Sequence, residues 1–219
     1  MKINQLFESN GETLYHGSSR PPADYEGIIK FRFRNLPSDT FIPFHNTVNE
    51  LSQKKFGVPI RSCFFCTISK NKALAYGEVL IVEPISPCRI FLNPYVFDMT
   101  DTYNVHEDTI FHELTSIVPN TMSNHQNNKP TFTQHLQDIF GEDDFYQINL
   151  ETFKHKIINN IDDEEIIKKT TVYLDNKIQE ANEYVTGLIE YNDVDKATSS
   201  IHERVELMVY AKEFKYKKA

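Results

Sequence analysis

Apolar residues recur with two different periods along this chain, and the change of period predicts both helices and strands. In the range 162–191 they recur every three or four residues, which is the spacing of an amphipathic helix. A helix over 43–55 is predicted on the same grounds, and Gly57 is placed to end it. In the C-terminal stretch 204–218 apolar and polar residues alternate, which is typical of a single strand with one buried face.

Shorter apolar runs predict the remaining elements, and glycine or proline separates them. Strands are expected at 13–15, 27–34, 61–67, 79–83 and 88–92. Ser69 and Gly77 bracket a short helix, and a Gly-Ser turn is expected directly after the first strand. Further helices are expected at 109–117, 131–140 and 150–161, with loops in the rest of 94–130. The order of elements predicts an α+β fold in one domain, residues 1–219.

Composition and charge restrict the class of protein. With 219 residues, 40% hydrophobic and 25% charged, the chain is long enough to bury one sizeable core. A net charge of −8 argues against binding of a nucleic-acid backbone over a wide face. No run approaches the length of a membrane span, and the first residues lack the apolar core of a signal peptide. We therefore expect a cytoplasmic protein with no membrane partner.

The three cysteines are interpreted as structural. Cys63 and Cys66 have the CxxC spacing, but no second pair of cysteine or histidine follows at the distance of a zinc finger. Both lie in an expected buried strand, where cysteine behaves as a small hydrophobic residue. His106 and His112 are each followed by glutamate, but a six-residue spacing does not put both on one helix face. No metal site is expected.

Three separated motifs carry the candidate chemistry. The first strand leads into Tyr15-His16-Gly17-Ser18, two aromatic residues eleven apart (Phe65 and Tyr76) flank a Ser-Lys-rich helix start, and Glu206 lies in the terminal strand. The order and spacing resemble the ADP-ribosyltransferase fold, on the His-Tyr-Glu branch that diphtheria toxin and the poly-ADP-ribose polymerases share. The stretch 32–40 also resembles small phage-encoded proteins of uncertain function, in which case the host cytoplasm is the expected location.

The resemblance implies a fold and a co-substrate. The fold would be a split, mostly antiparallel β-sheet core (motifs within 13–92 and 200–219) with a loop and helical insertion at about 94–195. NAD would be the co-substrate, and no metal would be needed. ADP-ribose would pass from NAD to a macromolecular acceptor, with release of nicotinamide. Acidic overall charge favours a protein over a nucleic acid as acceptor.

The resemblance also implies residue roles. Glu206 would bind the 2′-hydroxyl of the nicotinamide ribose and stabilise an oxocarbenium-like transition state. The rings of Tyr76 and Phe65 would sandwich the nicotinamide, a flat aromatic cation. His16 would bind the adenosine-side ribose, Gly17 would offer its main chain to the carboxamide, and Ser18 its hydroxyl. Glu206, His16 and Tyr76 are the implied catalytic set. The implied NAD-binding set is Tyr15, His16, Gly17, Ser18, Phe65, Tyr76, Arg32 and Arg34.

Several residues depart from the family pattern or have a second interpretation. Phe65 stands where the family has a tyrosine, and Arg204 precedes Glu206 where arginine-modifying toxins carry a glutamate or glutamine. His16 is also consistent with a buried, satisfied histidine, and Tyr76 with a core aromatic residue. Glu206 could pair with a cation on an exposed strand. For Arg32 and Arg34, a solvated basic edge is an equal alternative to contact with a pyrophosphate.

Two functions of other classes stay open on the sequence alone. A non-catalytic module could keep the fold to bind NAD, ADP-ribose or a partner, although an intact glutamate weighs against it. An NAD glycohydrolase would use water as the acceptor. An RNA 2′-phosphotransferase is disfavoured because its arginine set has no clear counterpart in this sequence.

Overall fold

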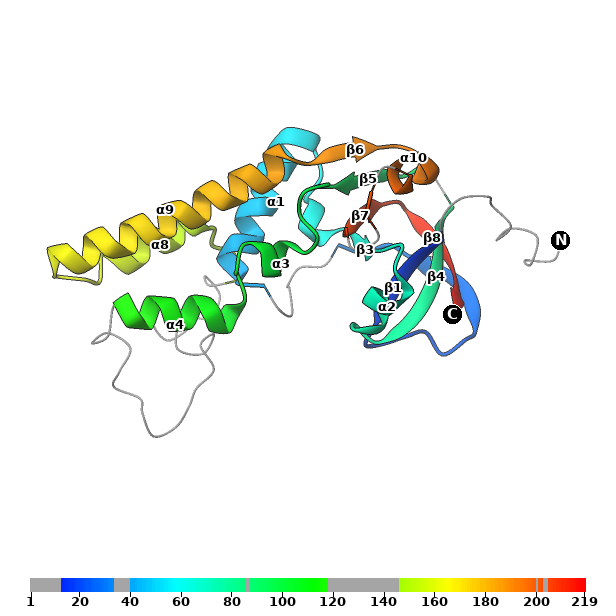
Figure 1. Ribbon diagram of the computed structural model, residues 1–219, viewed down its shortest axis with the longest axis horizontal. Helices are drawn as coiled ribbons and strands as arrows, with labels where there is room; N and C mark the ends of the chain where they lie inside the picture. The colour runs from blue at the N-terminus through cyan, green and yellow to red at the C-terminus, as the bar shows by residue number, and fades with distance from the viewer. Residues whose placement is uncertain (1–12, 34–39, 86, 118–145, 200, 203–204) are drawn as a thin grey trace. The chain divides into compact units, whose positions relative to one another are not determined.

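The computed structural model describes residues 13–33, 40–85, 87–117, 146–199, 201–202 and 205–219 (Figure 1). The chain divides into two compact units, each built from separated segments. The first unit comprises 1–33, 63–98 and 187–219, and the second comprises 34–62 and 99–186. The helix expected at 131–140 and Arg34 lie outside the described residues. The prediction of a single domain stays a prediction.

The first unit contains two antiparallel sheets. Its elements are β1 (Leu14–Ser18), β2 (Glu26–Lys30), β3 (Phe64–Cys66), α2 (Lys70–Leu74), β4 (Glu78–Pro84), β5 (Arg89–Leu92), β6 (Ile189–Tyr191), α10 (Val194–Thr198), β7 (Leu207–Tyr210) and β8 (Glu213–Lys218). In the first sheet the strand order is β1-β4-β8-β2, and in the second it is β3-β7-β5-β6. Every pair within these sheets is antiparallel. The expected α+β class with antiparallel strands is confirmed.

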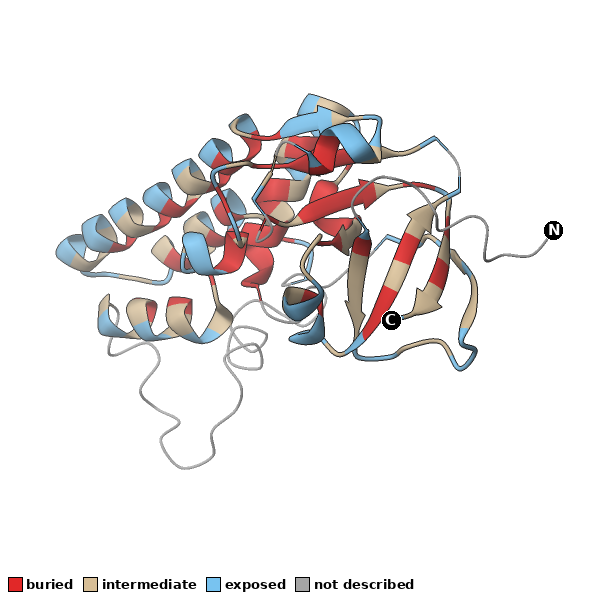
Figure 2. Cartoon of the chain, turned by 45° about the vertical axis from the view of Figure 1, so that its right-hand side comes forward, coloured by how far each residue is buried: buried red, intermediate tan, exposed pale blue. Residues whose placement is uncertain are grey.

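One hydrophobic core joins the two sheets. Alternation along each strand turns one face inward, and both inner faces contribute to the same buried cluster. From the first sheet come Leu14, Leu80, Val82, Phe214 and Tyr216, and from the second Cys66, Ile90, Leu92, Leu207 and Val209. Figure 2 shows the buried positions recurring along the strands. The ring of Phe64 stacks on Phe214, with centroids 4.5 Å apart, and so links the two sheets.

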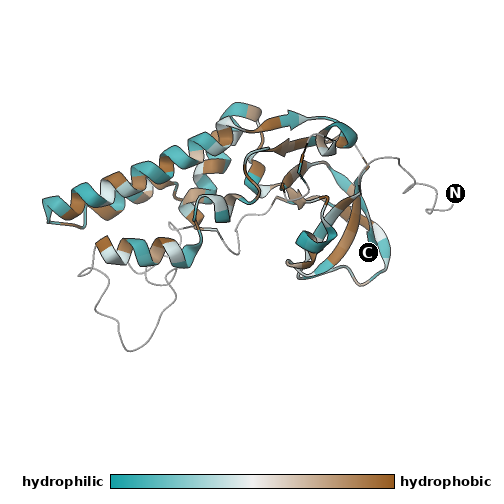
Figure 3. Ribbon diagram, viewed as in Figure 1, coloured by the Kyte–Doolittle hydropathy of each residue, from teal (hydrophilic) through white to brown (hydrophobic). Residues whose placement is uncertain are grey.

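The second unit is helical. It contains α1 (Ile42–Phe56), the 3₁₀ turn η2 (Ile60–Ser62), α3 (Met99–Thr102), α4 (Glu107–Ile117), α8 (Leu150–Ile158) and α9 (Glu164–Thr186). The long helix α9 packs against α1, α8 and α4, and Figure 3 shows hydrophobic and hydrophilic positions mixed along it. Gly57 ends α1 as predicted, in the left-handed conformation with φ of 71°. No helix in the described ranges combines the length and the apolar character that crossing a bilayer requires.

The prediction of one continuous C-terminal strand is wrong. The chain forms β7 in the second sheet and β8 in the first, and Ala211 and Lys212 lie between them. Inward-facing residues are odd-numbered in β7 (Leu207, Val209) and even-numbered in β8 (Phe214, Tyr216), so the period-two pattern shifts by one residue. Met208, expected on the polar face, is fully buried. Leu207, Met208 and Val209 are all buried, so β7 is covered on both of its faces.

Other boundaries also differ from the sequence prediction. The expected strand 61–67 is reduced to β3, because its first residues form η2. The predicted helix 162–191 ends at Thr186, and the following residues form β6. The helix α3 was not expected. The first strand does not stop before a Gly-Ser turn, since β1 runs through His16 and Gly17 to Ser18, all three paired with β4.

Candidate functional site

An isolated antiparallel bridge joins Tyr15 of β1 to Thr67, the residue after β3. The main chains of Tyr15 and Thr67 exchange two hydrogen bonds, of 2.7 and 2.9 Å between nitrogen and oxygen. In a continued antiparallel ladder, the next such pair would be Gly17 and Phe65. That pair does not form, because the bridge at Tyr15 and Thr67 is isolated. The strands therefore part at His16, in the middle of the first sequence motif.

The side chain of His16 takes the place of the missing strand bond. Its Nδ1 atom lies 2.8 Å from the carbonyl oxygen of Phe65, the acceptor that the amide of Gly17 would otherwise reach. A carbonyl oxygen only accepts, so Nδ1 carries the proton, and in the neutral ring Nε2 bears the lone pair. The half-buried imidazole also stacks on Phe64, with centroids 4.2 Å apart. His16 is thus a satisfied ring with a fixed orientation at the point where the strands part.

The main chain of Gly17 faces the opening between β1 and β3. Successive residues of a strand direct their N–H and C=O groups to alternate neighbours. Because Tyr15 bonds to Thr67, the groups of Gly17 point to the same side, away from β4. In the part of the chain that the structure describes, no main-chain partner outside the sheet ladders takes them. One donor and one acceptor of the main chain therefore line this opening.

Only glycine fits at position 17. A Cβ atom added there would lie 2.0 Å from the carbonyl oxygen of Ala73 and 2.8 Å from Cβ of Tyr76. The strand β1 therefore passes directly against the last turn of α2 and the residues after it. Ser69 caps the start of α2 by accepting from the amide of Lys72, and Gly77, with φ of 128°, ends the segment. These local signals, which the sequence predicted, set Tyr76 beside Gly17.

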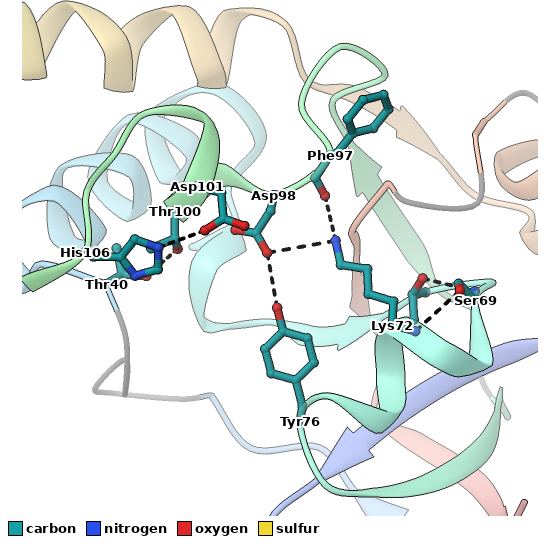
Figure 4. Close-up of polar contacts among 10 residues, drawn as sticks. Thr40, Ser69, Lys72, Tyr76, Phe97, Asp98, Thr100, Asp101 and His106 are labelled. Carbon is teal, nitrogen blue, oxygen red and sulfur yellow. Dashed lines mark hydrogen bonds and ion pairs between the residues drawn. The ribbon is translucent and has the colours of Figure 1, made fainter.

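Tyr76 is a surface residue, and the interpretation as a core aromatic is wrong. Its side chain is 45% exposed. The hydroxyl donates a hydrogen bond of 3.1 Å to Oδ2 of Asp98, and the ammonium of Lys72 lies 3.9 Å from the same oxygen (Figure 4). Lys72 also donates to the carbonyl oxygen of Phe97 at 2.7 Å. The ring is therefore held through its polar end.

The strand register relates Phe65 to Glu206. Phe65 pairs with Met208, and directly opposite residues project to the same face of a sheet. Continuing the alternation by two residues puts the half-buried Glu206 on that face, next to the last pair, Cys66 and Leu207. His16 instead contacts Phe64, which projects to the other face of β3. His16 therefore contacts β3 through Phe64 and Phe65, and Glu206 directly precedes β7, the strand that pairs with β3.

The remaining predicted residues divide between the opening and the far edge of the first sheet. Ser18 ends β1, and its hydroxyl accepts from the amide of Arg20 at 3.3 Å. Arg32 is exposed and follows β2, which β4 and β8 separate from β1. Its neighbours Phe31 and Phe33 pack their rings on Tyr210 of β7. The exposure of Arg32 is consistent with a solvated basic edge.

Sequence reasoning missed two side chains near the opening. Lys72 lies within the second motif but had no role assigned, although its place in the short helix between Phe65 and Tyr76 was a usable signal. Asp98 had no signal, because it lies 22 residues from Tyr76 in a loop without periodic pattern. Among the described residues, no group of three or more His, Cys, Asp or Glu side chains is placed to hold a metal ion.

The cysteines have the environment of structural residues. Cys63 and Cys66 are buried and unbonded to each other. Burial raises the pKa of the Cys63 thiol to about 12 and raises the pKa of Cys66 as well. Thiols of this kind are protonated and inert at neutral pH.

Comparison of the chain with protein-family models, with curated proteins and with solved structures gives no match. The functional argument therefore rests on the residues and the geometry described above.

Proposed function

We propose that this protein is an NAD-dependent ADP-ribosyltransferase of the His-Tyr-Glu type, with a split sheet core. The observation that carries the proposal is the parting of β1 and β3 at His16, with the main chain of Gly17 facing the opening and Tyr76 beside it. Glu206, which directly precedes β7, completes the set of residues in the family order.

Nicotinamide recognition follows from the groups at Gly17. A carboxamide has one acceptor oxygen and a donor NH₂ group, which match the N–H and C=O of a single residue. The ring of Tyr76 next to Gly17 offers an aromatic face to the pyridinium cation, with Phe65 as the second ring. The absence of a Cβ at Gly17 lets the main chain approach a ligand closely.

The ribose rings would contact His16 and Glu206. With the proton fixed on Nδ1, Nε2 of neutral His16 accepts a hydrogen bond from a ribose hydroxyl. Cleavage breaks the bond between C1′ of ribose and the ring nitrogen, whose electron pair leaves with nicotinamide. The Glu206 carboxylate stabilises the positive charge that develops on the sugar, and an acceptor nucleophile then bonds to C1′ and loses its proton. An extended dinucleotide crossing the end of β3 would meet both residues.

The acceptor is proposed to be a protein. The net charge of −8 disfavours a polyanionic acceptor that would have to approach the molecule against its charge. Water as the acceptor would make the protein an NAD glycohydrolase, and the two outcomes differ in their products.

The test is nicotinamide release from labelled NAD in the presence of a cell lysate. Replacing Glu206 by Gln keeps the size of the side chain and removes its charge, so we expect release to fall by about 10²–10³-fold. The matched control is Glu213→Gln, a half-buried glutamate that starts the neighbouring strand β8. A labelled macromolecule indicates transfer, and free ADP-ribose indicates hydrolysis. A wild-type protein that releases no nicotinamide would contradict the enzyme, and calorimetric NAD binding without turnover would favour a binding module.

A further inference from the structure

Beyond its main chain, Tyr76 is held at its hydroxyl. A side chain that is 45% exposed has few packing contacts to hold its ring in one rotamer. Its hydroxyl, however, donates to Asp98, whose side chain is only 17% exposed (Figure 4). Hydrogen bonds to a charged acceptor are stronger than those between neutral groups. The orientation of the ring therefore depends on where Asp98 is held.

Asp98 stands at the end of a turn that is itself firmly held. The side chain of buried Asn93 accepts from the amide of Tyr95 at 3.1 Å, and its carbonyl accepts from Val96 at 3.1 Å. Lys72, on α2, reaches the far end of this turn through the carbonyl of Phe97. The turn 93–98 and the segment that carries Tyr76 are thus tied together twice, once by Lys72 and once by Tyr76.

We infer that Asp98 is a positioning residue, which holds the ring of Tyr76 in the orientation that stacks on the nicotinamide of NAD. The inference rests on the proposed function and extends it to a residue outside the three motifs. The carboxylate also puts a negative charge at the hydroxyl end of the ring. That charge favours the cationic nicotinamide of NAD over the neutral nicotinamide that leaves.

The alternative is that Asp98 only stabilises the turn 93–98. The two roles make different predictions about pairs of substitutions. If Asp98 acts through the hydroxyl of Tyr76, then removing either partner abolishes the same interaction, and removing both adds nothing further. If Asp98 acts on the turn alone, the two effects multiply.

The experiment is a double-mutant cycle on the kinetics of nicotinamide release. We expect Asp98→Ala and Tyr76→Phe each to raise the KM for NAD by about 10-fold, and the double variant also by about 10-fold rather than about 100-fold. Asp98→Asn should recover part of the loss, because the amide oxygen still accepts from the hydroxyl. The control Asp24→Ala, an exposed residue of the same unit, should leave KM unchanged.

The outcomes separate the inference from the function on which it rests. Active wild type with multiplicative losses, or with no loss in Asp98→Ala, overturns the positioning role alone. Wild type that neither binds NAD nor releases nicotinamide overturns the proposed function, and the positioning role with it. Thermal unfolding of each variant confirms that a raised KM comes from a folded protein.

Discussion

At the scale of single residues, the sequence presented His16 either as a satisfied structural histidine or as a ligand-binding residue, and its hydrogen bond is compatible with both. Its Nδ1 is satisfied by the carbonyl of Phe65, as in a structural histidine. The same bond fixes the ring and its tautomer, so that Nε2 is the acceptor atom of the neutral ring. The hydrogen bond from His16 also occupies the carbonyl oxygen of Phe65, which would accept from the amide of Gly17 if the strands continued to pair. The main chain of Gly17 therefore faces the opening.

Gly17→Ala tests the close approach between β1 and α2. The added methyl would meet a main-chain oxygen at 2.0 Å, which cannot move aside without shifting α2. We expect a loss of about 1–3 kcal/mol in the free energy of unfolding, measured by urea titration. Nicotinamide release should also fall, because the shift displaces Tyr76.

Gly27→Ala is the matched control, since it also replaces a strand glycine of the first sheet. Its added Cβ would meet only the ring of Tyr216, at 3.0 Å, and a side chain gives way more easily than main chain. We therefore expect Gly27→Ala to lose less free energy of unfolding than Gly17→Ala. Equal urea midpoints for wild type and Gly17→Ala would contradict the close approach.

At the scale of elements, an ion pair adds to the antiparallel ladder that attaches the three-residue strand β6 to β5. Arg89 of β5 contacts Glu190 of β6 through two hydrogen bonds, of 2.6 and 3.0 Å. The Arg89 side-chain hydrogen bond lowers the pKa of the Glu190 carboxyl from its ordinary value of 4.5. The folded protein therefore holds this carboxylate charged to lower pH than the unfolded chain does.

Glu190→Gln should lower stability only where the carboxylate is charged. The pair stabilises the fold above the unfolded pKa, and this contribution is lost as the pH falls through the lower, folded value. Because the Glu190 side chain is 35% exposed, we expect a difference of only about 0.2–1 kcal/mol at neutral pH. Urea unfolding over a range of pH measures it. A difference that persists in acid would show that the pair is not its cause.

Prediction of elements from the sequence succeeded where the signals are local. Gly57 ends α1 and Ser69 caps α2, and both effects act within four residues along the chain. The division between β7 and β8 was also present in the sequence, as the shift of the apolar positions from odd to even after Ala211. The prediction of one uninterrupted strand does not account for that shift. The burial of Met208 had no such signal, because it depends on tertiary packing against the second face of the sheet.

At the scale of the whole molecule, all the described candidate residues belong to the first unit. His16, Phe65, Tyr76 and Glu206 come from segments separated by most of the chain, yet all four lie in the unit that holds the two sheets. The helices of the second unit contribute none of them. Binding of NAD should therefore stabilise one unit and leave the other unchanged.

Hydrogen exchange in the presence of NAD tests this division. We expect amide exchange to slow at β1, at β3 and in the segment around Tyr76, because a ligand that binds the folded state opposes local opening. Exchange in α8 and α9 of the second unit serves as the internal control and should not change. Slowing confined to the helical unit would contradict the location of the NAD site.

The sequence by itself determined the mixture of helices and strands, the ends of α1 and α2, and the order of the three motifs. Each depends on interactions between neighbours along the chain or on residue identity alone. Tertiary structure decided the bond from His16 to Phe65, across 49 residues, and the bond from Tyr76 to Asp98, across 22. It also decided that β1 and β3 part after a single bridge. Contacts between distant segments depend on how the sheets pack, and no local pattern encodes that packing.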